Sequence, residues 1–334
     1  ITLHGNVHTV ESIFPHEQSF FFNDFLSLAA ILFLYGGSPL MKRVVLWLLP
    51  FVLVASLANQ RRAAILALVV GFLVLLLVTA VAHPGRRRVV VKVLLLLALV
   101  LPPYYLAYKN STGLIGEPAH SFASAFTPDS RDASSNLYRV NEDKDILATM
   151  RLSPIIGYGY GKPMITPYPL ANISNVYIFW NIMPHDSILW VWMRLGTIGY
   201  LFFWLLIGTA IGQAASFARA SRHPPTKGIA VFILLLVVQE VIFGYLDLQW
   251  TNYRNLITLG VLLALLGKLA AFQPPGVEPK ASTPARPRPR GATRSLPSSL
   301  AVRDGRIRRE GFEPSVVATP FGGVLKHEPA DPPP

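Results

Sequence analysis

The feature that most constrains the fold of this chain is a set of apolar runs long enough to cross a membrane. The clearest run, residues 63–82, reads AAILALVVGFLVLLLVTAVA and contains no charged residue. A helix of about 20 apolar residues spans the hydrocarbon core of a bilayer, so each such run is a candidate span. The sequence therefore predicts an all-α, multi-pass transmembrane helix bundle with about seven spans. They lie at about residues 20–36, 44–58, 63–82, 89–107, 187–212, 228–248 and 255–272.

Composition supports a membrane protein and excludes several other classes. Of the 334 residues, 52% are apolar and only 14% are charged, which argues against a fully water-facing surface. There is no cysteine, so neither a disulfide framework nor a thiolate metal site is possible. The net charge of +12 comes from short loops and the C-terminal part of the chain. Membrane topology explains that distribution better than nucleic-acid binding does, and we expect no nucleic-acid partner.

The chain divides into a membrane domain and a tail. Residues 1–272 hold the predicted spans, with one long polar loop at 108–184 between the fourth and the fifth. Residues 273–334 are rich in Pro and Arg and lack the apolar residues needed for a core. We therefore expect this tail to be disordered.

The distribution of Lys and Arg predicts the orientation of the bundle. If the seven spans alternate, most basic residues of the short loops fall on one side of the membrane. Cytoplasmic loops are enriched in Lys and Arg, so this side is predicted to be the cytoplasm. The long loop is then external and the tail cytoplasmic. The residues that set this orientation are Lys42, Arg43, Arg86, Arg87, Arg88, Arg219, Arg222 and Lys227.

One short turn departs from this rule. Residues 59–62, NQRR, place Arg61 and Arg62 on the side predicted to be external. These arginines can reach the lipid headgroups from a helix end. Alternatively, the paired guanidinium groups bind an anion, most naturally a phosphate, whose oxygens match the planar fork of Arg. The sequence leaves both interpretations open.

The segment PHDSILWVWMRLGTIGY, residues 184–200, opens the most aromatic span with polar residues. On a single helix at about 100° per residue, His185, Gly196 and Gly199 share one face. Small residues there would let a neighbouring helix approach closely below the His. Asp186 is a candidate capping residue at the helix start. His185 is either an anchor at the membrane interface or a general base or hydrogen-bond donor.

Two further charges lie inside predicted spans. Arg194 is on the opposite helix face from His185 and about 12 Å from the helix end. Glu240 lies at a similar depth in the next span. Because ionisable residues within a membrane usually pair with each other, we predict a structural ion pair between Arg194 and Glu240.

The long loop contains an amphipathic helical pattern at 137–150, followed by GYGYG at 157–161. This is neither a phosphate-binding loop nor a dinucleotide fingerprint. The alternating glycines suit a close backbone approach, and Tyr158 and Tyr160 would offer aromatic faces to a sugar. A plain turn fits the pattern equally well. Arg139 and Arg151 flank the helix and are candidates for anion contacts or solvated loop charges.

A metal site is not predicted. The N-terminal His4, His8, His16 and Glu17 lack the HExxH spacing and its helical context.

The motifs resemble those of the O-antigen ligases and related bacterial polysaccharide polymerases. The family signature is a His followed by Asn, Ser or Gln, nine residues, Gly, two residues, and then Gly, Thr or Tyr. His185, Gly196 and Gly199 reproduce this spacing, whereas Asp186 is an acid where the family has an amide or a hydroxyl. The segments ANQRRAAILAL and RLSPIIGYGYG are also similar to family segments, and the likeness covers about residues 40–215.

This resemblance implies transfer of a glycan at the outer face of the bacterial inner membrane, without cofactor, nucleotide sugar or metal. The donor would be a glycan on undecaprenyl pyrophosphate, and the acceptor a hydroxyl on lipid A core, a growing polysaccharide or a protein. Members usually have ten or more spans, so the resemblance also implies further spans before residue 1. It leaves ligase and polymerase open, and a transporter or flippase for a lipid-linked anionic glycan is the alternative class.

The resemblance also implies roles for particular residues. His185 would orient or deprotonate the acceptor hydroxyl, and Asp186 would either raise the basicity of His185 or cap the helix. Tyr158, Tyr160, Gly196 and Gly199 would support the site. Arginines would hold the pyrophosphate, with Arg62 and Arg139 the first choices among Arg61, Arg62, Arg139 and Arg151.

Overall fold

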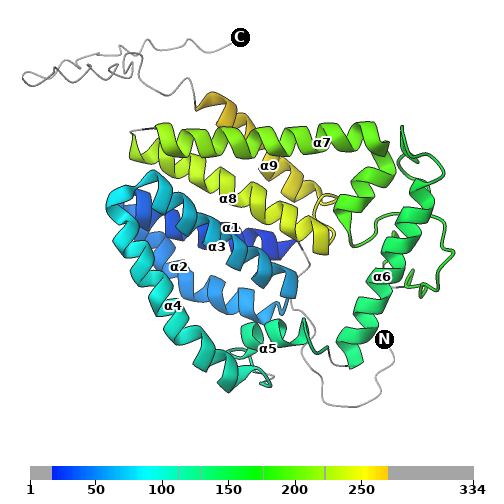
Figure 1. Ribbon diagram of the computed structural model, residues 1–334, viewed down its shortest axis with the longest axis horizontal. Coiled ribbons are helices and arrows are strands. Elements are labelled where there is room, and N and C mark those ends of the chain that lie inside the picture. Colours follow the sequence, from blue (N-terminus) through cyan, green and yellow to red (C-terminus); the bar gives the residue numbers. More distant parts are fainter. Residues whose placement is uncertain (1–16, 112, 129, 176, 222, 270–334) are drawn as a thin grey trace, which may run out of the picture. The chain divides into compact units, whose positions relative to one another are not determined.

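The computed structural model describes residues 17–269 except residues 112, 129, 176 and 222, and this part of the chain is helical without a β-strand (Figure 1). The all-α prediction is confirmed for it. The predicted tail at 273–334 and the N-terminal histidines lie outside the described residues. The helices are α1 (Gln18–Tyr35), α2 (Pro39–Ala58), α3 (Arg62–Ala82), the short 3₁₀ helix η1 (Pro84–Arg86), α4 (Arg87–Tyr108), α5 (Glu117–Ser124), α6 (Ser130–Met150), α7 (Ser187–Ala220), α8 (Pro224–Leu246) and α9 (Tyr253–Lys268).

Six of the described helices are long and apolar enough to cross a membrane: α1, α2, α3, α4, α7 and α8. They correspond to the first six predicted spans. The seventh predicted span, 255–272, overlaps α9, which has 16 residues and a length of about 24 Å. That is shorter than the roughly 30 Å hydrocarbon core of a bilayer, although residues 270–272 lie outside the described part.

α8 is the centre of the bundle. It packs against α1, α3, α7 and α9, and most of its side chains are buried. A helix that is apolar on every face is expected to occupy such a central position. α2 and α4 differ, because large apolar side chains such as Trp47, Phe51, Leu95 and Leu99 are exposed along them. An apolar surface of this extent is suited to lipid rather than to water.

α7 is broken at Gly196. This residue has φ 66° and ψ −176° in the middle of an otherwise helical segment. A side chain is strained in that conformation, and a Cβ on Gly196 would lie 2.3 Å from the backbone of both Gly157 and Ile155. Figure 1 shows the first turns of α7 bent away from its long remainder.

The loop that follows α6 supplies the hydrogen bonds that the break removes. The amides of Tyr158 and Gly159 donate to the carbonyls of Met193 (2.7 Å) and Arg194 (3.2 Å). In the other direction, the amide of Thr197 donates to the carbonyl of Pro154 at 2.8 Å. A helix can be interrupted inside a membrane protein only where such partners satisfy the freed backbone groups.

The break corrects the predicted helix face. His185 precedes α7, which begins at Ser187, and the helical phase is lost at Gly196. His185, Gly196 and Gly199 therefore do not form one continuous face. The close approach at Gly196 is made by the loop at 154–159 and not by a neighbouring helix.

The predicted ion pair between Arg194 and Glu240 is wrong. The Arg194 guanidinium donates to three backbone carbonyls, those of Gly159 (2.8 Å), Lys162 (2.7 Å) and Ile182 (2.6 Å). Both carboxylate oxygens of Glu240 lack a hydrogen-bond partner among the described residues. Arg194 is 1% exposed, and the bent loop presents its carbonyls closer to the guanidinium than any carboxylate. Arg194 thus ties the loop to α7.

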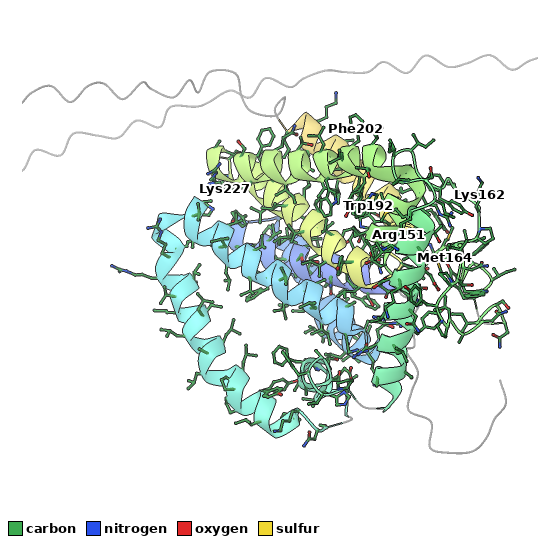
Figure 2. All side chains as sticks on the ribbon, turned by 45° about the vertical axis from the view of Figure 1, so that its right-hand side comes forward. Arg151, Lys162, Met164, Trp192, Phe202 and Lys227 are labelled. Carbon is green, nitrogen blue, oxygen red and sulfur yellow. The ribbon has the colours of Figure 1, made fainter. Side chains whose placement is uncertain are left out.

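The long loop lies at the opposite side of the bundle from the start of α8 (Figure 2). In Figure 2, Lys227 in the first turn of α8 lies at the opposite side of the view from Lys162 and Met164 in the long loop. The long loop and α6 therefore gather at one end of the bundle, where the candidate site is found.

Candidate functional site

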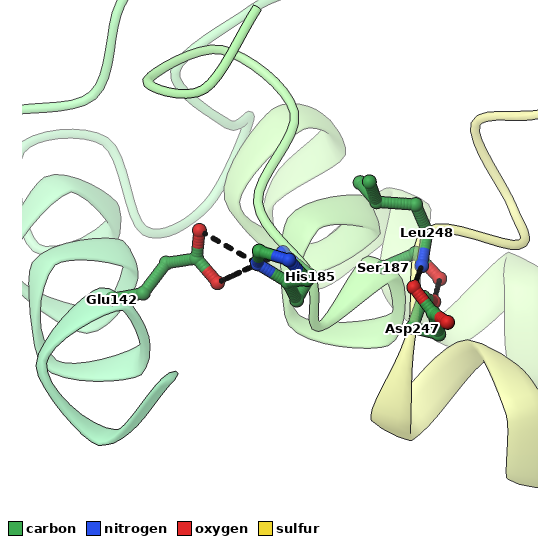
Figure 3. A network of polar contacts seen from close by, with 5 residues as sticks. All are labelled: Glu142, His185, Ser187, Asp247 and Leu248. Atoms are coloured by element: carbon green, nitrogen blue, oxygen red, sulfur yellow. Dashed lines mark hydrogen bonds and ion pairs between the residues drawn. The ribbon is translucent and has the colours of Figure 1, made fainter. Parts of the chain in front are cut away.

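His185 is held by a buried carboxylate from α6. Its ring Nδ1 lies 3.0 Å from Oε2 and 3.3 Å from Oε1 of Glu142, and its backbone amide donates to Oε2 at 2.9 Å (Figure 3). Glu142 is 1% exposed, whereas the His185 side chain is 22% exposed. The carboxylate thus fixes both the backbone and the ring of a partly accessible histidine.

This contact sets the tautomer of the ring. A carboxylate accepts hydrogen bonds, so Nδ1 carries the proton and the lone pair of the neutral ring lies on Nε2. The Tyr138 ring packs edge-on against the imidazole with the ring centres 5.9 Å apart. Tyr138 and Glu142 are four residues apart on α6 and therefore lie on the same helix face. That face of α6 therefore holds the His185 ring in place.

The start of α7 is fixed next to His185. Asp186 caps the helix, since its Oδ1 accepts the Leu189 amide at 2.8 Å. Ser187 Oγ donates to the Gly244 carbonyl near the end of α8 at 2.7 Å. It also lies 3.0 Å from the carbonyl of Asp247, the residue after α8 (Ser187 and Asp247 are labelled in Figure 3). Of the two roles open to Asp186, the structure shows capping, and Glu142 is the acid that contacts the ring.

An open pocket of about 410 Å³ adjoins His185. It lies between α6 and the loop that precedes α7, and Arg139 is part of its wall. The pocket therefore combines an imidazole ring with a guanidinium group in one lining. Its lining residues are Ser134, Ser135, Tyr138, Arg139, Ala171, Ile173 and His185.

The other three predicted anion-binding arginines lie elsewhere. Arg61 is the residue before α3, and Arg62 Nη1 lies 3.4 Å from Ser124 Oγ of α5. Arg151, labelled in Figure 2, is exposed just after α6. It lies twelve residues after Arg139, which is about 18 Å along a helix. Among these four arginines, Arg139 alone lines the pocket with His185.

The two loop tyrosines pack against protein and do not line the pocket. The Tyr160 ring meets the Trp190 ring edge-on at 5.5 Å. Lys162 Nζ lies 5.4 Å from the centre of the Tyr158 ring. Gly159, which lies between the two tyrosines, and Arg194 hold this loop against α7.

Burial raises the pKa of several groups around His185. The pKa of Asp186 is raised to about 7, mainly by burial and further by the charge of Asp143. The pKa of Asp143 is raised to about 6 by burial and by the adjacent Glu142. Burial and Glu142 raise the pKa of Tyr138 to about 12, so it stays a neutral phenol. Two carboxyl groups near His185, those of Asp143 and Asp186, therefore titrate near neutral pH.

Glu142 was not identified from the sequence. A weak signal was present, because Glu142 follows Arg139 by three residues on the predicted amphipathic helix and so shares its face. That pattern alone does not distinguish a site residue from a solvated charge. No group of three or more His, Asp or Glu side chains in residues 17–269 is arranged to hold a metal ion, within the part described.

Together, the fold and the site define a multi-pass helical membrane protein with a histidine-carboxylate pair beside an arginine-lined pocket. Residues 44–204 match the family model described as O-Antigen ligase. This region of the chain is therefore similar to the O-antigen ligase family. The matched region begins in α2, includes all four arginines, Glu142 and His185, and ends beyond the break in α7. No curated protein matches the chain.

Proposed function

We propose that this protein transfers a glycan from undecaprenyl pyrophosphate to an acceptor hydroxyl at the outer face of the bacterial inner membrane. The acceptor is a hydroxyl of lipid A core, a growing polysaccharide or a protein. The family match supports glycan transfer of the O-antigen ligase type. The observation that carries the proposal is the pocket in which Arg139 and His185 meet, with Glu142 behind the histidine.

In the proposed reaction, His185 is the general base. The acceptor oxygen attacks the anomeric carbon of the glycan and gives its proton to Nε2 of His185. The bond between that carbon and the phosphate oxygen breaks, and the lipid pyrophosphate leaves with the electron pair. Glu142 stabilises the imidazolium that forms, because its carboxylate lies 3.0 Å from Nδ1.

Arg139 is the first candidate for binding the pyrophosphate. A guanidinium group beside the base can pair with phosphate oxygens and stabilise the charge that develops on the leaving group. Arg61, Arg62 and Arg151 remain candidates for further contacts with the donor, to be tested after Arg139. Arg62 leads these three because its segment, ANQRRAAILAL, is similar to a family segment.

The test is an assay of the purified full chain in lipid vesicles with a polyprenyl-pyrophosphate glycan and a lipid A core acceptor. We expect His185→Ala to abolish transfer, and Arg139→Ala to weaken donor use. His223→Ala is the matched control, because His223 lies between α7 and α8 and contacts Thr226 instead of the pocket. Undiminished transfer by His185→Ala would contradict the assigned base. Translocation of the glycan without bond formation would favour a transporter.

Glu142→Gln tests the histidine-carboxylate pair. The amide keeps the shape but cannot stabilise the imidazolium, so we expect kcat to fall about 10- to 100-fold. Asp143→Asn, the neighbouring acid, should cause a smaller loss. An unchanged kcat in Glu142→Gln would leave Glu142 with a structural role alone.

A further inference from the structure

A second group of polar side chains lies inside the bundle, away from the pocket. Asp24 of α1, Glu240 of α8 and Asn255 of α9 meet there, and Gln249 of the turn before α9 contacts Asn255. Glu240, Asn255 and Gln249 are 0% exposed and Asp24 is 8% exposed. The proposed glycan transfer uses none of them.

The two carboxylates lie close together without a compensating cation. The charge of Glu240 interacts electrostatically with Asp24. The side-chain amide of Asn255 lies next to the Glu240 carboxyl group. Four buried oxygens have no hydrogen-bond partner among the described residues. They are Asp24 Oδ1, Glu240 Oε1, Glu240 Oε2 and Asn255 Oδ1.

Three arginines of the helices that pack against α8 contact other groups. Arg194 of α7 binds backbone carbonyls, and Arg62 of α3 contacts Ser124. Arg254 of α9 pairs with Glu17 at 3.7 Å. Within the described part of the chain, the charged group that bears on Asp24 is therefore Glu240 itself.

Two ionised carboxylates are not stable side by side in this buried environment. An unpaired ionised carboxylate in a medium of low dielectric constant is strongly unfavourable, and a like charge beside it makes ionisation harder still. Protons remove both penalties. A carboxyl O–H on Glu240 can donate to Asn255 Oδ1, and one on Asp24 can donate to the second oxygen of Glu240. All four unpartnered oxygens are then satisfied, and no net charge remains.

We propose that Asp24 and Glu240 form a proton-binding site inside the membrane-spanning bundle, and that both carboxyl groups are protonated while α1, α8 and α9 are packed together. The site lies one helical turn from Gly244, whose carbonyl holds Ser187. Ionisation of the pair would draw water between α1, α8 and α9 and loosen the end of α8. That end of α8 holds Ser187, which lies two residues after His185. Proton binding thus supports the packing beneath the pocket.

The first test is infrared spectroscopy of the full chain in lipid at neutral pH. We expect a carbonyl stretch of protonated carboxylic acid that loses intensity in Asp24→Asn and again in Glu240→Gln. Glu117→Gln is the matched control. Glu117 is also buried, but Ser121 Oγ donates to it at 2.9 Å, so the band should stay unchanged. A band that is absent, or that neither variant reduces, overturns the proposal.

The second test is the pH dependence of thermal unfolding. Unfolding exposes the carboxyl groups to water, where they ionise, so the wild-type melting temperature should fall as pH rises. Glu240→Gln resembles the protonated acid and cannot ionise, so its decline should be shallower. A sodium site would give a different result: the melting temperature would rise with NaCl but not with choline chloride at equal ionic strength, and the infrared band would be absent. That outcome would overturn the proton assignment. Neither test uses a glycan donor, so the outcome is separate from that of the transfer assay.

Discussion

The two ends of the segment 185–198 are built for different purposes. At the first end, His185 is held by the carboxylate of Glu142 and lines an open pocket. At the second end, Gly196 is closed against the backbone of the loop at 154–159, and Arg194 fastens that loop from within. The first end faces an open pocket, whereas the second is closed against protein. Substitutions at the second end should therefore affect folding before they affect transfer.

Gly196→Ala is expected to have the largest effect on stability. The methyl group would lie 2.3 Å from backbone atoms of Gly157 and Ile155, in a conformation that already disfavours a side chain. Backbone atoms cannot yield as a flexible side chain can, so we expect a loss of about 3 kcal/mol or more. Thermal unfolding in detergent measures it. The matched control is Gly208→Ala, farther along α7, where a Cβ would meet nothing within 4 Å. Equal effects of the two variants would refute the distinction.

Arg194→Met should be somewhat less severe. It removes the donors to Gly159, Lys162 and Ile182 and leaves buried carbonyls without partners, at a cost of about 3 kcal/mol. Hydrogen exchange should rise first in the loop around Gly159. Arg219→Met, an exposed arginine in the last turn of α7, is the control. If the loop stays protected in Arg194→Met, the second end does not depend on this residue.

Asp186→Asn should have the smallest effect, and a stabilising one. The pKa of Asp186 is raised from 3.8 to about 7, so folding disfavours its ionised form. The stability associated with this group is present below pH 3.8 and is lost as pH rises through about 7. Asn does not titrate and still caps the helix, so the variant should gain stability relative to wild type, more at pH 8 than at pH 5.

Melting temperatures at the two pH values measure this difference. Asp186→Ala provides the contrast, since it removes the charge together with the cap and should lose about 1 kcal/mol of that benefit. A gain for Asp186→Asn that is the same at pH 5 and pH 8 would show that titration of Asp186 is not the cause.

Local patterns were sufficient to predict the helices. Apolar runs of sufficient length identified six spans, and the amphipathic pattern at 137–150 falls within α6. The spacing of His185, Gly196 and Gly199 also led to the family that the match over residues 44–204 supports. These features depend on residues close together in the chain, which is why the sequence alone reveals them.

Contacts between distant segments could not be predicted in the same way. A helical wheel assumes one continuous helix, so it misplaced His185 relative to Gly196 and gave Arg194 a partner on the next span. The positive φ of Gly196 depends on the loop at 154–159, which has no visible complement in the sequence. Glu142 could not be identified for the same reason, because its contact is with His185, 43 residues away in the sequence.

The interrupted helix also determines how this protein can be recombined with its relatives. The loop at 154–162 supplies amides and carbonyls that the segment 193–198 lacks, and the segment in turn supplies the guanidinium that holds the loop. Neither piece is complete without the other, although about 30 residues separate them. In a hybrid protein the two segments should therefore come from the same parent, even when the residues between them are exchanged.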